Sequence, residues 1–242
     1  MTSSWVTSVI TIAITVFGAG LAIGYAGSPD RADQAKTMIA AGSMLGMIVV
    51  AVLGALVMTG EYASGQIRSS MMAVPHRGRL FTAKALVVSG FSFVLGLLSV
   101  TLAYAASYPF MKGHAGSLTD THYLGLFWGT GLSFAIIALM AQGVGHLTRS
   151  TAGAITVVVS VLFVVPLPFQ MMAGHWKWVN KVLGLLPDTL STAVSDPFSL
   201  AHQWGQAGTA TFLQHWQAIA VFAAWAIIPM VIAAVVFTRR DA

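Results

Sequence analysis

The stretch Glu61–Lys84, EYASGQIRSSMMAVPHRGRLFTAK, separates two apolar runs, Thr37–Thr59 and Ala85–Ala106. Each run is long enough to cross a bilayer. The stretch predicts a polar loop with a short helix, because Glu61 would complement the positive end of the helix dipole at its start and Pro75 would stop it. A membrane protein with one sizeable polar loop on one side is expected to contact a partner through it.

The composition is that of an integral membrane protein. The 242 residues are 57% hydrophobic and 8% charged, and the mean hydropathy is +0.80. Helices are expected rather than a barrel, because the apolar runs are continuous over roughly 20 residues instead of alternating over about 10. The chain has no cysteine, which excludes disulfides, thiolate metal sites and a cysteine nucleophile.

The apolar runs predict an all-α fold with six transmembrane helices in one domain, 1–242. A helix within the Glu61–Lys84 loop and short external helices between spans five and six complete it. Pro166 and Pro168 are expected to kink or break span five, and a helical stretch Val179–Leu186 is expected to end at Pro187. The predicted spans are about 5–26, 37–59, 85–106, 125–145, 152–171 and 218–237.

Charge predicts the orientation. Six spans place both termini on one side, and termini inside would put seven basic residues in the shorter internal segments and five in the longer external ones. Because basic residues are retained in the cytoplasm, we expect a multi-pass protein of the cell membrane with both termini cytoplasmic. The net charge of +5 reflects this retention rather than binding to nucleic acid.

Several patterns have two interpretations. Gly42 and Gly46 lie one turn apart in span two, which favours tight packing within the subunit, with a dimer face as the alternative. His114 and His122 are expected to be solvated side chains rather than a metal site. The basic residues of the Glu61–Lys84 loop either dock a partner or simply lie beside anionic lipid, and we favour docking.

If the chain transports a substrate, two absences indicate that the energy comes from another molecule. No charged residue falls in the middle of a predicted span, although ion-coupled carriers generally need one. The sequence also contains no Gly-x-x-x-x-Gly-Lys-Ser/Thr loop to bind a nucleotide. A separate ATPase partner would supply what this chain lacks.

The loop pattern Glu-Tyr-x-x-Gly-x-Ile-Arg, followed by Pro75-x-Arg77, resembles the first cytoplasmic loop of ABC-2-type (type V) permeases, the membrane subunits of ATP-driven exporters. The C-terminal Phe237-Thr-Arg-Arg-Asp-Ala is similar to the tail of many of these chains, and the resemblance covers essentially the whole sequence. Such chains usually carry a basic amphipathic segment before the first span; here that segment is missing or the start lies upstream. In the family the loop forms a coupling helix that docks on the ATPase, which implies coupling roles for Glu61, Tyr62, Gly65, Arg68, Pro75 and Arg77.

The resemblance implies a non-catalytic permease subunit that works as a homo- or heterodimer with ABC-type ATPase subunits, and ATP and Mg are expected on those partners. Uncharged walls predict an amphipathic or hydrophobic substrate, such as a drug, a peptide or a lipid-like molecule, moved out of the cytoplasm. The alternatives are a carrier or channel that works without ATP, and a membrane scaffold or sensor. The predicted pathway residues lie in spans two and five: Met47, Val50, Val158, Leu162 and Val165.

Overall fold

The computed structural model describes residues 2–25, 39–66, 72, 77–110, 121–173, 175–195 and 213–239, and every regular element among them is a helix. Five stretches are long and apolar enough to cross a membrane: 43–64, 78–110, 123–148, 151–172 and 215–237. A shorter apolar stretch, Trp5–Gly20, lies in the helix assigned to the first predicted span. The all-helical membrane fold is therefore confirmed, with five candidate spans in the described residues.

The helices are α1 (Thr2–Tyr25), α3 (Ser43–Ser64), α5 (Arg77–Ser107), η2 (Tyr108–Phe110), α6 (Thr121–Thr148), α7 (Thr151–Val159), η3 (Ser160–Val164), α8 (Pro166–Met172), α9 (Lys177–Gly184), α10 (Pro187–Ser195) and α12 (His215–Arg239).

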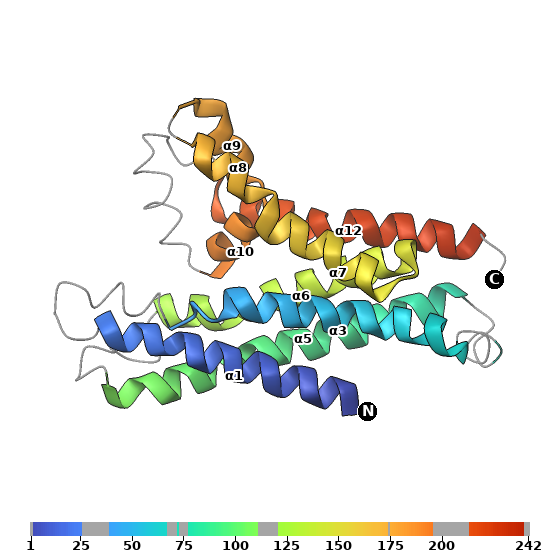
Figure 1. Ribbon diagram of the computed structural model, residues 1–242, viewed down its shortest axis with the longest axis horizontal. Helices are drawn as coiled ribbons and strands as arrows, with labels where there is room; N and C mark the ends of the chain where they lie inside the picture. The colour runs from blue at the N-terminus through green and yellow to red at the C-terminus, as the bar shows by residue number, and fades with distance from the viewer. Residues whose placement is uncertain are drawn as a thin grey trace.

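Helix α6 is the centre of the molecule. It packs against α3 and α5 on one side and against α7, α10 and α12 on the other. Figure 1 shows α1, α3, α5 and α6 lying roughly side by side, with α12 and the α7–α8 segment beyond α6. The two groups of helices share one core, which includes Val50 of α3, Phe134 of α6, Val158 of α7 and Phe222 of α12.

Glycines decide how closely these helices approach. A Cβ placed at Gly54 of α3 would lie 2.2 Å from the carbonyl oxygen of Ala138 in α6. A Cβ at Gly42 would lie 2.6 Å from the carbonyl oxygens of Ile14 and Thr15 in α1, and one at Gly46 would lie 2.9 Å from Phe134. Gly42 and Gly46 therefore pack α3 within its own chain, as the first of the two interpretations predicts, and neither is available as a dimer face.

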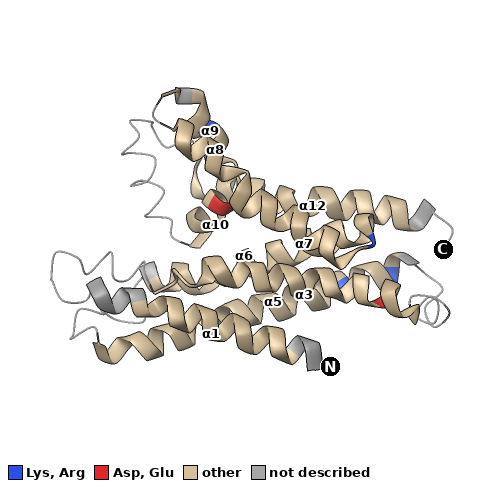
Figure 2. Ribbon diagram, in the orientation of Figure 1, with Lys and Arg blue, Asp and Glu red and all other residues tan. Residues whose placement is uncertain are grey.

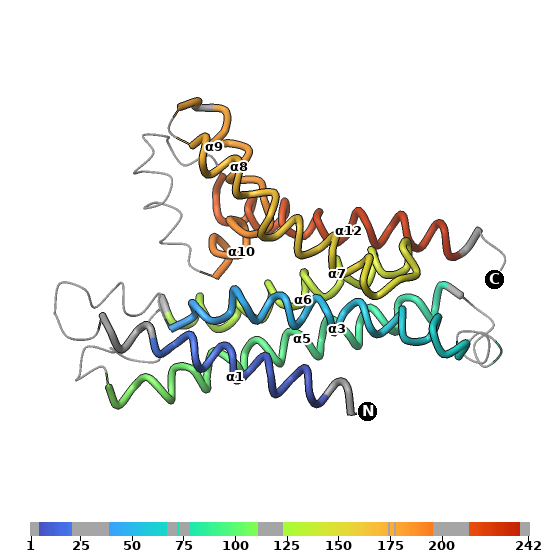
Figure 3. Tube along the Cα trace, viewed as in Figure 1, coloured from blue at the N-terminus to red at the C-terminus, as the bar shows by residue number. Residues whose placement is uncertain are grey.

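The helix ends gather at two ends of the molecule. The beginnings of α1, α5 and α7 lie at the same end as the last turns of α3, α6 and α12 (Figures 1 and 3). The start of α1 and the end of α12 thus lie at the same end of the molecule. That this side is cytoplasmic stays a prediction.

The second span continues further than expected, which corrects the position of Glu61. Helix α3 runs without a break to Ser64, so Glu61 lies in its last turn instead of starting a separate loop helix. The helix ends at Gly65, whose φ of +71° is in the left-handed region that favours glycine. The expected helix dipole interaction at Glu61 is wrong, because a carboxylate at a helix C-terminus meets the negative end of the dipole. The predicted turns of loop helix at 66–72 lie largely outside the described residues.

Span five contains an irregular segment before its prolines. Residues 160–164 form a π-helix, in which the Val165 N–H donates to the Ser160 carbonyl oxygen at 2.8 Å. Pro166 follows at the first position of α8, the helix position at which proline is best tolerated. The prolines therefore change the helix locally but do not break the span.

Short helices link spans five and six, as predicted. Helix α9 covers 177–184, close to the predicted stretch, and Pro187 begins α10 rather than only ending the helix before it. The indole N–H of Trp225 in α12 donates to the Leu185 carbonyl oxygen at 2.9 Å and fixes the α9–α10 turn to α12.

Candidate functional site

Several charged residues lie at the end of the molecule where α3 finishes (Figure 2). Glu61 and Tyr62 in the last turn of α3 meet Lys84 of α5, His146 of α6 and Arg149 of the α6–α7 turn. We call these five residues the α3-end cluster. Three helices and the α6–α7 turn thus contribute to one group of contacts beside the polar loop that the sequence singles out.

Glu61 and Lys84 form an ion pair between α3 and α5. The Lys84 side chain is 14% exposed and that of Glu61 is 23% exposed, so both groups are partly withdrawn from water. The Nζ of Lys84 also lies 3.6 Å from the Met58 sulfur. A lysine here offsets the unfavourable position of Glu61 at the negative end of the α3 dipole, and it ties α3 to the first turns of α5.

His146 lies buried behind this ion pair, with 4% of its surface exposed. Its ring centroid is 4.8 Å from that of Phe81 in α5, 5.6 Å from Phe237 in α12 and 6.5 Å from Tyr62. Neither ring nitrogen has a hydrogen-bond partner among the described residues. The imidazole therefore acts as an aromatic packing residue that joins α3, α5, α6 and α12.

Arg149 forms the turn between α6 and α7. Its φ of +51° is the one positive value among the described non-glycine residues. The next residue, Ser150, caps α7 by accepting a hydrogen bond from the Gly153 N–H at 3.2 Å. In this turn the Arg149 Cζ lies 5.5 Å from the centroid of the Tyr62 ring, close enough for a cation–π contact.

A hydrogen bond between two threonines connects α3 directly to α7. The Thr151 hydroxyl lies 2.6 Å from the Thr59 hydroxyl, which in turn donates to the Ala55 carbonyl oxygen at 2.9 Å. Thr59 is 2% exposed. Together with the Arg149–Tyr62 contact, this bond links the end of span two to the start of span five.

The predicted coupling residues divide into two groups. Glu61 and Tyr62 lie in the α3-end cluster, and Gly65 caps α3 at an exposed position. Arg77 begins α5, although its side chain is not described, and Arg68 and Pro75 lie outside the described residues. A role of these residues in ATPase coupling stays a prediction.

Four of the five predicted pathway residues are buried in the core of the chain. Met47 and Val50 of α3 are 4% and 0% exposed, and Val158 and Leu162 of span five are 0% and 1% exposed. Val165 is 36% exposed. In this conformation spans two and five pack against neighbouring helices at these positions, so the four buried residues could line a pathway only after the helices separate.

Several residues of the site are missing from the sequence prediction. His146 lies inside α6, three residues before Arg149, and a lone imidazole near the end of an apolar helix is a signal that could have identified it. Thr59 and Thr151 gave no such signal, because they are 92 residues apart in the chain.

Within the described residues no three His, Cys, Asp or Glu side chains gather to bind a metal ion, and the side chains of His114 and His122 are not described.

Comparison with known proteins agrees with the fold. A family model described as "ABC-2 family transporter protein" matches residues 3–242, which is nearly the whole chain. No individual curated protein matches the chain. The match extends over both groups of helices around α6.

Proposed function

Because the chain belongs to the ABC-2 transporter family, we propose that it is the permease subunit of an ATP-driven exporter in the cell membrane, with the α3-end cluster on the cytoplasmic side. As a family member it is a multi-pass membrane transport protein. The observation that carries the proposal is the position of the cluster: it lies directly beside the polar loop and is joined to α5, α6 and α7. A force applied at the loop would therefore reach several spans at once.

An ABC-type ATPase would dock on the polar loop and the exposed residues next to it. Gly65 and Arg79 are exposed on the two sides of the loop, and Met72 within it is 80% exposed. Arg68, Pro75 and Arg77 belong to the same docking segment in this proposal. ATP and Mg would bind to the ATPase, and this chain would contribute no catalytic residue.

The α3-end cluster and the neighbouring Thr59–Thr151 hydrogen bond would transmit a movement of the docked loop to the membrane spans. The Glu61–Lys84 ion pair would make the end of α3 and the start of α5 move together. The Thr59–Thr151 hydrogen bond and the Arg149–Tyr62 contact would carry the movement into α7. Beyond α7, the π-helix before Pro166 is a place where span five can change its direction, since π segments replace the regular hydrogen-bond pattern.

The substrate in this proposal is amphipathic or hydrophobic. Met47, Val50, Val158 and Leu162 would be uncovered when spans two and five shift, and they would offer an apolar surface that adapts to different molecules. Val165, already partly exposed, would lie nearest to the external end of that pathway. A second permease copy would form its other wall.

Docking is tested with two charge reversals in the segment. We expect Arg68→Glu and Arg79→Glu to lower the amount of ABC-type ATPase that copurifies with the permease, while membrane insertion is unchanged. Lys181→Glu, at the opposite end of the molecule, is the control for an equal change of charge. Equal ATPase recovery with all three variants would contradict the docking segment.

Transmission is tested by exchanging the two charges of the ion pair. Glu61→Lys and Lys84→Glu should each uncouple substrate-stimulated ATP hydrolysis, because each leaves two like charges in contact between α3 and α5. The double variant Glu61→Lys/Lys84→Glu should regain most of the stimulation. If Glu61 instead contacts the ATPase directly, the double variant will stay as defective as Glu61→Lys alone.

Vesicle transport separates the proposed function from the alternatives. Uptake of a hydrophobic fluorescent dye into inverted vesicles should require ATP and the copurified ATPase. Dye transport without ATP would indicate a carrier or channel, and intact ATPase binding with no transport of any compound would favour a scaffold or sensor.

A further inference from the structure

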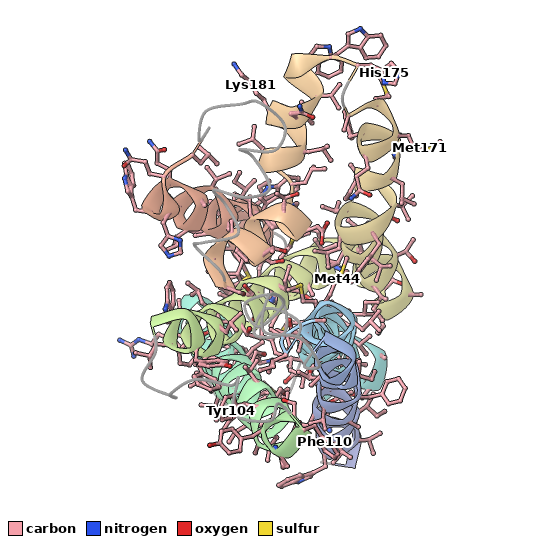
Figure 4. All side chains as sticks on the ribbon, turned by 90° about the vertical axis from the view of Figure 1, so that its left-hand side faces the viewer. Met44, Tyr104, Phe110, Met171, His175 and Lys181 are labelled. Atoms are coloured by element: carbon pink, nitrogen blue, oxygen red, sulfur yellow. The ribbon has the colours of Figure 1, made fainter. Side chains whose placement is uncertain are left out.

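The hairpin formed by α8 and α9 carries an exposed pair of tryptophans at its tip. The rings of Trp176 and Trp178 are nearly parallel, with an interplanar angle of 17° and centroids 6.3 Å apart. They are 52% and 53% exposed. In the view along the molecule, the hairpin extends away from the α1–α6 group, with Met171, His175 and Lys181 around its end (Figure 4).

The position of the tip along the chain sets its depth in a membrane. The span 151–172 has 22 residues, which corresponds to roughly 33 Å of helix and is close to the thickness of the hydrocarbon core. Trp176 follows this span by four residues, so a span that crosses the membrane would place it in the headgroup region. Helix α12 begins at the same end of the molecule (Figure 1), and its second residue, Trp216, is 63% exposed. Exposed tryptophans at this depth are typical of the membrane interface.

Helix α9 carries positive charge on the hairpin. Lys177 and Lys181 are one turn apart in α9, and Lys181 is exposed on the same helix as Trp178. On the other side of α9, Val179 is fully buried against the protein. The sequence from Pro166 to Leu186 contains no aspartate or glutamate, so this segment carries a net positive charge.

We propose that the tip of the α8–α9 hairpin is an interfacial anchor that binds anionic phospholipid headgroups. The tryptophan pair and the adjacent Met171, which is 83% exposed, enter the boundary between headgroups and acyl chains. The exposed Lys181 then lies at the level of the lipid phosphates, and Lys177 contributes a second positive charge to the same helix. The anchor holds the far end of span five at a fixed depth, and it does not depend on the coupling role proposed for the α3-end cluster.

A probe at the tip tests this anchor in the full-length protein. The chain has no cysteine, so His175→Cys provides a single attachment site for an NBD fluorophore at an exposed position. The labelled protein is reconstituted in vesicles with nitroxide-labelled phosphatidylglycerol or phosphatidylcholine. We expect both lipids to quench the probe, with half-maximal quenching at a roughly fivefold or more lower fraction of phosphatidylglycerol.

Matched lysine variants assign the preference. Lys177→Gln/Lys181→Gln should abolish the preference for phosphatidylglycerol, whereas Lys177→Arg/Lys181→Arg should keep it. Lys36→Gln/Lys112→Gln, which removes the same charge from other loops predicted for this side, should also keep it.

Three results would overturn the proposal. One is a probe that neither lipid quenches, which would place the tip in water. If the unlabelled His175→Cys variant also forms a disulfide between two copies, the unquenched tip instead lies against a second copy of the chain. The others are equal quenching by the two lipids in the parent protein, and a preference that survives Lys177→Gln/Lys181→Gln. None of these results bears on ATPase docking, which the charge reversals at the loop test separately.

Discussion

Helix α6 and the span formed by α7, η3 and α8 are both long and apolar enough to cross a membrane, yet they sit in different surroundings. In the most apolar 18-residue stretch of α6, 72% is buried within the chain, against 22% for span five. Sequence hydropathy does not separate them. This difference identifies α6 as the centre of the molecule. Span five has most of its surface free to contact lipid or a second chain.

Small residues are the physical cause of the burial of α6. A Cβ at Gly131 would lie 2.9 Å from the Phe93 carbonyl oxygen of α5, and one at Gly129 would lie 2.4 Å from the backbone of Ser195 in α10. A Cβ at Gly143 would lie 2.9 Å from the backbone of Met230 in α12. In span five, by contrast, a Cβ at Gly153 would meet nothing closer than 3.4 Å, and the exposed positions hold larger side chains such as valine and leucine. We infer that span five can shift at a lower free-energy cost than α6.

The largest expected effect comes from filling a close approach to α6. Gly54→Ala should destabilise the protein by about 3 kcal/mol or more, because the new Cβ would meet the Ala138 backbone, which cannot move aside easily. Gly60→Ala in the same helix has open space around it and should be neutral or slightly stabilising. Thermal unfolding followed by circular dichroism measures both. Equal stability of the two variants would contradict the close packing of α3 on α6.

Truncations on the two faces of span five sharpen the comparison. Leu162→Ala removes a side chain that is 1% exposed and should lower the free energy of unfolding by about 2–4 kcal/mol. Val164→Ala, two residues away and 56% exposed, should change it by less than about 1 kcal/mol. The measurement is unfolding in detergent and again in the assembled complex. A large loss for Val164→Ala in the complex alone would show that a second chain covers this face.

Removal of the threonine link should have a moderate effect. Thr151→Val deletes the hydrogen bond to Thr59, whose hydroxyl keeps its bond to Ala55, so the expected loss is about 0.5–1.5 kcal/mol. Thr101→Val removes a hydroxyl that bonds only within its own helix and serves as the control. Unfolding measurements on both variants, with substrate-stimulated ATP hydrolysis as a second readout, test whether the link matters more for coupling than for stability. Identical behaviour of the two variants would argue against a link between α3 and α7.

The smallest expected effect concerns Asp188, near the start of α10. Burial raises the pKa of this carboxyl above its usual range. Because the folded state then binds the proton more tightly than the unfolded chain, the contribution of Asp188 to stability falls as the pH rises through that raised pKa. Asp188→Asn should therefore raise the melting temperature more at pH 7 than at pH 4. Thr189→Ala does not titrate and should shift it equally at both values; a parallel shift for Asp188→Asn would contradict the assignment.

The sequence was informative about the membrane fold because hydrophobic length is a property of each segment alone. It also located the Glu61–Lys84 loop beside the candidate site. It misplaced the end of span two, since the charge of Glu61 suggests that a loop begins there. In the folded chain Lys84, about two turns into α5, neutralises Glu61 and allows α3 to continue to Ser64.

The apolar runs, the absence of mid-span charges and the positions of the basic residues determined by themselves that this is a helical membrane protein with one prominent polar loop, and the loop motif indicated a transporter family. Only the tertiary structure decided that His146, Phe81 and Phe237 meet, that Thr59 bonds Thr151, and that Met47 and Val50 are buried. The physical reason is that burial in lipid depends on the composition of each helix, whereas these contacts depend on which helices the small residues allow to approach.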